Sequence, residues 1–223
     1  GVPGRPVGDG PDGHSLWPGF TNVPNEFIES YFPLRIERYE TIPDSGGAGL
    51  HRGGNGLSVA YRFLCDGDIG IHDERWLTYP WGVLGGETGL RSTKRLVRVD
   101  GSEQWLPAKA EGIKVKTGDM LYFNTWGGGG WGDPFARDPE LVQQDVNRRL
   151  VTVDGARRYG VVMASDGSVD QDATQTLRAE LKAAAGEPAL FNFGGDVEEI
   201  RARCEAETHL PAPVKPTFIG ASQ

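Results

Sequence analysis

Glycine constrains the fold of this chain more than any other residue does. The sequence has 33 glycines among 223 residues, gathered in short clusters, of which the densest is Gly127–Gly130. Because glycine has no Cβ, such clusters let two backbones approach more closely than side chains would permit. The clusters have no period of three, which excludes a collagen-like helix. Together with 15 prolines they favour a fold rich in loops and strands.

Composition and charge exclude several classes of protein. The length suits one large domain with a substantial core. The net charge of -8 argues against non-specific binding to nucleic acid or to an anionic membrane surface. No apolar run is long enough to span a bilayer, and no signal-peptide pattern is present. We therefore expect a soluble chain, and its start at Gly1 rather than Met suggests a piece of something longer.

The two cysteines indicate a reducing compartment. Cys65 and Cys204 lie far apart and match no paired-ligand spacing, so neither a disulfide framework nor a cysteine-based zinc site is expected. Both follow apolar patterns and are predicted to be buried and inert. A cytoplasmic location is the expectation that follows.

The periodicity of apolar residues changes along the chain. Alternation and frequent turn signals predict short strands within residues 34–39, 57–65, 96–99, 113–116 and 120–126. After residue 133 helical spacing and capping residues predict helices within 138–150, 173–185 and 196–204, the last burying Val197, Ile200 and Cys204, while 159–163 reads as a further strand. The predicted class is mainly β (α+β), an antiparallel sheet or sandwich with a helical C-terminal third.

Three regions are expected. Residues 1–33 form an extended arm rich in glycine and proline, packed on a partner. Residues 34–163 form the β-rich domain, and residues 164–223 a helical C-terminal extension with a proline-rich tail.

The most unusual stretch runs from Gly127 to Pro134. Gly127, Gly129 and Gly132 fit a dinucleotide-binding spacing, and such backbone can hold an anion through its N–H groups. However, Asp133 and Pro134 intervene before the helix, and no βαβ unit surrounds the motif. A structural role, in which side chains would clash with another backbone, is the better interpretation.

A second glycine cluster spans residues 45–56 and contains His51 and Arg52. These two side chains could present positive charge to an anionic or carbonyl substrate. A loop that packs closely on a neighbouring subunit is an equally good interpretation.

No catalytic or metal-binding set stands out from the residues alone. The histidines lack the spacing that places two ligands on one helix face, and no Gly-x-Ser-x-Gly elbow is present. Acidic residues such as Glu26, Glu29 and Asp44 are candidates for acid–base chemistry, but carboxylates are usually solvated. The six tryptophans leave open a third reading, a β domain that stacks sugars on residues 17, 76, 81, 105, 126 and 131.

Several blocks, in order, resemble the C-terminal part of the B-type subunit in the hydantoinase B family. This family includes subunits of ATP-dependent hydantoinases, 5-oxoprolinases, caprolactamase, and acetone and acetophenone carboxylases. The similar blocks are Thr21–Glu26, Phe32–Tyr39, Asp44–Gly49, Arg52–Gly56, Gly127–Pro134, Arg137–Pro139 and Ala156–Val162.

This resemblance implies chemistry shared between subunits. A hydantoinase-A-type partner would use ATP with Mg²⁺ to phosphorylate an amide or carbonyl oxygen of a small-molecule substrate. The B-type subunit would then host hydrolysis of a cyclic amide or carboxylation of a ketone, with a divalent metal (Zn or Mn) held by residues that lie upstream in the family. The implied partners are therefore the N-terminal half of the B-type subunit and the A-type subunit, in a hetero-oligomer, with no nucleic acid or membrane.

For this chain itself, the resemblance implies a wall of the reaction chamber rather than its chemical centre. Candidates for the substrate cavity or the subunit interface are Thr21, Asn22, Glu26, Asp44, His51, Arg52, Gly127, Gly129 and Gly132. No catalytic residue and no bound metal is assigned. The alternative is a non-catalytic assembly subunit, in which the glycine loops serve only close packing.

Overall fold

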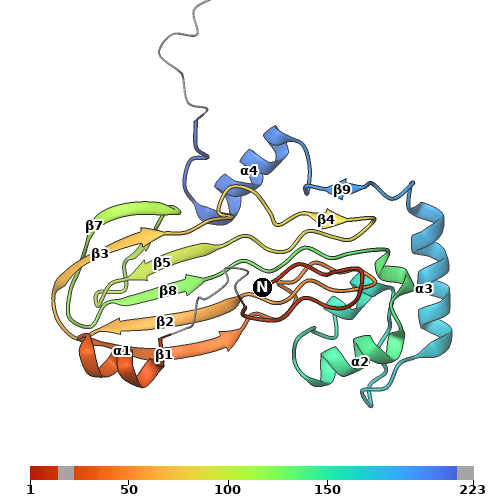
Figure 1. The fold of residues 1–223 in the computed structure, drawn as a ribbon, viewed down its shortest axis with the longest axis horizontal. Helices are drawn as coiled ribbons and strands as arrows, with labels where there is room; N and C mark the ends of the chain where they lie inside the picture. The colour runs from red at the N-terminus through yellow and green to blue at the C-terminus, as the bar shows by residue number, and fades with distance from the viewer. Residues whose placement is uncertain (15–22, 215–223) are drawn as a thin grey trace, which may run out of the picture.

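A five-stranded antiparallel sheet forms one half of the molecule in the computed structural model, which describes residues 1–14 and 23–214 (Figure 1). The order across the sheet is β1-β2-β8-β5-β6. These strands span Leu34–Thr41 (β1), Leu57–Phe63 (β2), Met120–Asn124 (β8), Thr93–Val97 (β5) and Glu103–Trp105 (β6).

One face of this sheet is covered by a two-stranded ribbon. Strands β3 (Gly67–His72) and β7 (Lys109–Val115) pair antiparallel with each other, and a turn at residues 117–119 connects β7 to β8. The core between sheet and ribbon consists of buried Phe63, Ile71, Leu96, Leu106, Val115 and Leu121. Apolar alternation in the strands thus produces one covered face and one open face.

A β-bulge in β1 changes which side chains reach the open face. Ile36 pairs with Tyr61, and Arg38 pairs with Ala60, so Glu37 is the extra residue. Strict alternation from the sequence places Arg38 on the same face as Ile36. The bulge instead turns Arg38 to the opposite face, beside Ala60.

The other half of the molecule is built around glycine. Segments 1–13, 44–56, 80–90 and 127–132 run side by side and exchange backbone hydrogen bonds, for example from Gly4 N to Gly129 O (2.8 Å) and from Gly128 N to Gly54 O (2.8 Å). We call these four segments the glycine body. In Figure 1 they form the long, irregular traces between the sheet and α3.

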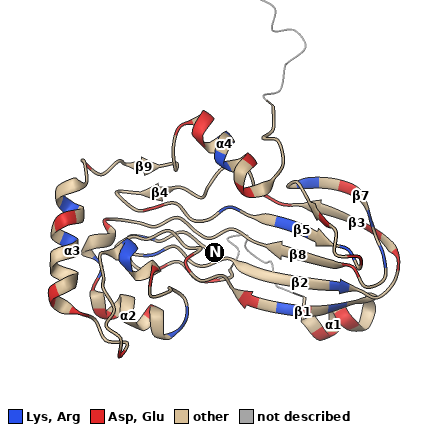
Figure 2. Ribbon diagram, turned by 180° about the vertical axis from the view of Figure 1, so that it is seen from behind, with Lys and Arg blue, Asp and Glu red and all other residues tan. Residues whose placement is uncertain are grey.

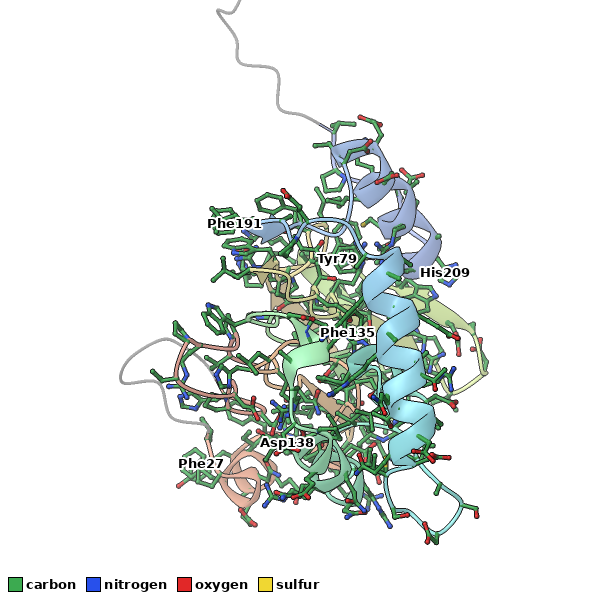
Figure 3. All side chains as sticks on the ribbon, turned by 90° about the vertical axis from the view of Figure 1, so that its right-hand side faces the viewer. Phe27, Tyr79, Phe135, Asp138, Phe191 and His209 are labelled. Carbon is green, nitrogen blue, oxygen red and sulfur yellow. The ribbon has the colours of Figure 1, made fainter. Side chains whose placement is uncertain are left out.

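Helices close the glycine body on one side. Helix α2 (Pro139–Asn147) begins at an Asp138 cap with proline in its first turn, and 3₁₀ helices η1 (Pro134–Ala136) and η2 (Gly155–Tyr159) flank it. A second core lies here, with Ala48, Val142, Val151, Ala156, Tyr159 and Val161 buried. Helix α3 (Gln171–Ala184) follows; Figure 3 shows it crossing in front of Phe135 and Asp138.

The last helix returns to the sheet side. Helix α4 (Val197–Thr208) starts with a capping box between Asp196 and Glu199, as the sequence predicts, and short strands β4 (Gly82–Val83) and β9 (Phe191–Asn192) pair before it. Helix α1 (Asn25–Tyr31) packs beside β1. No helix in the described ranges is long and apolar enough to cross a membrane.

The predicted fold class is confirmed, with antiparallel sheets and helices mostly in the C-terminal part. The strand predicted at 159–163 is wrong. Tyr159 ends η2 and Gly160 has a φ of 64°, so the segment turns, although Val161 is buried as a strand residue would be.

Two burial predictions also fail. Cys65 is exposed because it follows the last paired residue of β2, whereas Cys204 is buried as predicted. Val197 is 70% exposed because it is the first residue of α4 and faces away from Ile200 and Cys204, which are buried. Helix α1 lies in the N-terminal region where the sequence shows little periodicity.

Candidate functional site: a glycine body clamped by arginine–aspartate pairs

The segment Gly127–Gly130 is enclosed by the other three segments of the glycine body. A Cβ on Gly127 would lie 1.8 Å from the Ser45 carbonyl oxygen, and one on Gly130 would lie 2.0 Å from that of Ala48. The same construction on Gly128 and Gly129 meets the carbonyl oxygens of residues 2 and 81. The neighbour thus repeats every three residues, as in an extended threefold helix.

This arrangement confirms the structural interpretation of Gly127 and Gly129. All four glycines are buried, and their carbonyl and N–H groups are used in bonds to neighbouring segments, such as Gly47 N to Gly128 O at 2.8 Å. Gly132 has a φ of 75°, a conformation that L side chains rarely adopt. The backbone is therefore committed to packing rather than free to hold a phosphate.

Arg52 is a buried anchor of the glycine body. Its guanidinium donates from Nη1 to Asp12 Oδ1 (2.7 Å) and from Nη2 to Asp12 Oδ2 (2.9 Å), and its Nε lies 3.4 Å from Asp145 Oδ1. The Asp12 carboxylate also accepts from the backbone N–H of Asn55 (2.7 Å). Segment 1–13 is thereby fastened to segment 44–56 by charge-assisted bonds.

Arg137 makes a second clamp just before α2. Its Nη1 and Nη2 donate to the two oxygens of Asp9, each at 2.7 Å, and Nη2 also donates to Asp145 at 2.8 Å. The Arg137 side chain is 2% exposed and the Asp145 side chain 7%. Asp145 on α2 is therefore shared by both arginines, and two aspartates from the N-terminal segment complete the network.

Electrostatics in this network favour the charged forms. Burial alone would raise the pKa of the Asp9 carboxyl, but the hydrogen bonds and charge of Arg137 outweigh burial and hold that pKa below its usual value. Asp12 behaves in the same way: burial is opposed by bonds from Arg52 and the Asn55 N–H, and its pKa is lowered. Burial raises the pKa of neighbouring Tyr159 to about 12.

Asp44 is used as a local fastener. Its carboxylate accepts from Thr152 N (3.0 Å) and Thr152 Oγ1 (2.6 Å), and its backbone N–H donates to Leu150 O (3.1 Å). Asp44 has a φ of 61°, which aspartate tolerates better than most residues. The carboxylate lies against Gly155, where a Cβ would meet it at 1.9 Å.

His51 lies at the rim of the same network. Its ring stacks on Trp131 with centroids 5.6 Å apart, and its Nδ1 is 3.9 Å from Asp9 Oδ1. The backbones of these two residues also bridge, from His51 N to Trp131 O (3.0 Å). The histidine is half-buried and joins the two glycine clusters.

The remaining sequence candidates are not part of this network. Glu26 is exposed on α1, beside β1 and at the opposite end of the molecule from α2 (Figure 1). Thr21 and Asn22 lie outside the described residues. The structure therefore brings together Asp44, His51, Arg52, Gly127, Gly129 and Gly132, and leaves Glu26 apart.

Sequence reasoning gave no role to Arg137, Asp145 or Arg158. Arg158 donates to Glu87 (2.7 Å) and to the carbonyl oxygens of Asp44 (2.9 Å) and Gly46 (3.2 Å). Arg137 and Arg158 fall in blocks that carry the family resemblance, which is the one signal that could have singled them out. Asp145 has no such signal, because it sits within an ordinary helical pattern.

The described residues do not fit a metal ion. Across residues 1–14 and 23–214, no group of three or more His, Cys, Asp or Glu side chains is gathered as metal ligands would be. The carboxylates nearest to His51 and Arg52 are instead occupied by arginines. No chemical step through a metal is therefore derived for these residues.

Comparison with known proteins identifies the family. Residues 1–134 match the Hydantoinase B/oxoprolinase family, and the chain belongs to this family. Caprolactamase subunit beta of Pseudomonas jessenii is 36% identical over 161 residues, which cover 69% of this chain and 27% of that protein.

Two solved structures share the fold. The ATP-dependent caprolactamase from Pseudomonas jessenii has a TM-score of 0.62 and 32% identity, with 70% of this chain and 28% of that chain covered. A nucleotide-free acetone carboxylase has a TM-score of 0.66 at 22% identity over 80% of this chain and 29% of that chain, which shows the fold alone. The chain spans less than a third of the length of the curated relatives it matches.

Proposed function

We propose that this chain works as the C-terminal portion of a hydantoinase-B-type subunit in an ATP-dependent, multi-subunit cytoplasmic enzyme. The reaction is hydrolysis of a cyclic amide or carboxylation of a ketone through a phosphorylated substrate. Support comes from family membership and from relatives named as a caprolactamase subunit and an acetophenone carboxylase subunit. ATP with Mg²⁺ and a divalent metal (Zn or Mn) bind elsewhere in the assembly in this proposal.

Within that enzyme we assign this portion a structural role. The observation that carries the assignment is that Arg52, Asp44 and the four glycines of Gly127–Gly130, which carry the family resemblance, are all engaged within the chain. Arg52 offers its guanidinium to buried carboxylates rather than to open space. A rigid body of this kind suits the support of a chamber made with the N-terminal half of the subunit and an A-type subunit.

The reaction is tested with the assembled enzyme that contains this chain. Purified complex is incubated with ATP and hydantoin, 5-oxoproline, caprolactam or acetone with bicarbonate, and ADP and organic products are measured. The proposal expects substrate-dependent ADP release with a ring-opened or carboxylated product for one of these compounds. Absence of such coupling for all four would contradict it.

The structural role has a separate test in the same complex. Asn22→Ala and Glu26→Ala are compared with the parent enzyme for turnover per assembled complex. The structural assignment expects kcat within about twofold of the parent for both variants. A fall of a hundredfold or more, with the complex intact, would instead show that this segment contributes to chemistry, as general acid–base groups do.

A further inference from the structure

A polar cavity lies on the open face of the five-stranded sheet, away from the glycine body's arginine clamps. It has a volume of about 370 Å³, within the range of small-molecule sites. All five strands contribute to its lining, which consists of Arg38, Ser58, Thr93, Arg95, Trp105, Tyr122 and Asn124. Figure 2 shows basic residues on β1, β2 and β5 of this sheet.

Strand register explains why these side chains meet. Arg38 pairs with Ala60, Ala60 with Tyr122, Tyr122 with Arg95, and Arg95 with Trp105, so they form one row across the sheet. Directly paired residues point to the same face. The methyl group of Ala60 leaves room between the two arginines. The bulge at Glu37 is what places Arg38 in this row.

The adjacent row forms a hydroxyl and amide floor. Ser58 pairs with Asn124, and Asn124 with Thr93. Asn124 Nδ2 donates to Thr93 Oγ1 at 3.3 Å, which leaves Asn124 Oδ1 buried without a hydrogen-bond partner among the described residues. A buried, unpartnered carbonyl oxygen costs free energy unless a donor reaches it. This oxygen therefore indicates an N–H or O–H donor in the cavity.

The two arginines are held in place but keep donors available. The guanidinium carbons of Arg38 and Arg95 lie 6.0 and 5.2 Å from the Tyr122 ring centroid, and Arg95 also lies 5.9 Å from that of Trp105. Such cation–π contacts orient the guanidinium groups. Arg38 meets a carboxylate through Nε alone (Glu40, 3.3 Å) and Arg95 through Nη1 alone (Glu103, 3.0 Å), so most of their five N–H donors are free for another acceptor.

Charge balance favours a singly charged anion. Glu40 and Glu103 stand beside the arginines and offset part of their charge, whereas the seven lining residues include no carboxylate. A dianion such as phosphate would meet repulsion from both glutamates. A carboxylate matches the fork of a guanidinium and carries one charge.

We propose that this cavity binds a small organic carboxylate that also carries an N–H donor. The carboxylate lies between Arg38 and Arg95, and the N–H points to Asn124 Oδ1. This site goes beyond the proposed function, because none of its residues belongs to the glycine body and its test needs no turnover.

The probe is 5-oxoproline, which has one carboxylate and one ring N–H and fits the volume. Binding to the 223-residue chain is measured by isothermal titration calorimetry and compared with 2-pyrrolidone, which lacks the carboxylate, and cyclopentanecarboxylate, which lacks the N–H. We expect 5-oxoproline to bind at least tenfold more tightly than either. No binding, or equal affinity for all three, would overturn the proposal.

Variants locate the binding. Arg95→Gln and Arg38→Gln are each expected to weaken 5-oxoproline binding at least tenfold. Arg35→Gln is the matched control, because Arg35 is exposed at the edge strand, bonds to Glu37 and does not line the cavity. Circular dichroism confirms that the variants fold. A folded Arg95→Gln with unchanged affinity, or an equal loss in Arg35→Gln, would contradict the site.

Discussion

Arg137 and Asp9 are 128 residues apart in the sequence and are joined by two hydrogen bonds of 2.7 Å between the guanidinium and both carboxylate oxygens. The same arginine bonds to Asp145 at the start of the next helix's last turn. One side chain thus ties the N-terminal segment, the end of the Gly127–Gly132 stretch and α2 together. This relationship makes the glycine body a unit rather than a set of loops.

Arg137→Met should strongly destabilise the fold. It leaves the carboxylates of Asp9 and Asp145 partly or fully buried without their partner, and breaking a buried pair in this way costs about 3–5 kcal/mol. Urea denaturation measures the loss. Lys114→Met is the control, because its pair with Asp68 is exposed and should cost no more than about 1 kcal/mol. Equal effects for the two variants would remove the clamp from the account.

The stability provided by Asp12 should depend on pH. Its native pKa lies below the usual value of 3.8, so the ion pair with Arg52 stabilises the fold fully above that pH and is lost as the pH falls through the native pKa. Thermal unfolding of the parent and Asp12→Asn should therefore differ most near pH 6 and converge below about pH 3. Asp68→Asn, an exposed site, should show little difference at any pH. A constant gap for Asp12→Asn down to pH 2 would contradict the prediction.

Gly129→Ala should disrupt the glycine body. The new Cβ would lie 1.8 Å from the Trp81 carbonyl oxygen, so backbone must move, and a loss of about 3 kcal/mol or more is expected. Gly67→Ala is the control, since nothing lies within 4 Å of its Cβ position. Chemical denaturation compares the two. A Gly129→Ala protein as stable as the parent would show that the backbones are not in close contact.

Asp44 offers a test of local fastening. Asp44→Ala loses two bonds to Thr152 and places alanine at a φ of 61°, so about 2–3 kcal/mol should be lost. Asp44→Asn keeps an acceptor and tolerates that φ, and should lose about half as much. Asp166→Ala, in an exposed turn that bonds only to Ser168, should cost less than about 1 kcal/mol. Melting temperatures that do not follow this order would contradict the assignment.

The sequence predicted the elements with clear periodicity and missed those fixed by distant contacts. Strand β2 and helix α4 follow from alternation and from the Asp196–Glu199 cap. The apolar residues at 159–163 mimic a strand, but Gly160 turns the chain and Val161 is buried against helices instead. The bulge that moves Arg38 to the open face leaves no mark in the sequence pattern.

The candidate site was predicted in part. Glycine density correctly indicated close backbone approach at Gly127 and Gly129, because only the missing side chain allows it. The arginine partners could not be predicted, since Asp9 and Arg137 meet only after four separate segments have packed. Local spacing holds no information about such a pairing.

Native mass spectrometry of the enzyme isolated from its source tests the central claim most directly. The account predicts that this sequence occurs in an assembly far heavier than the 24.2 kDa of the chain, with an A-type ATP-binding subunit and the rest of a B-type subunit. The dissociated complex should release these components together. A stable monomer of 24.2 kDa with no companion would contradict the account.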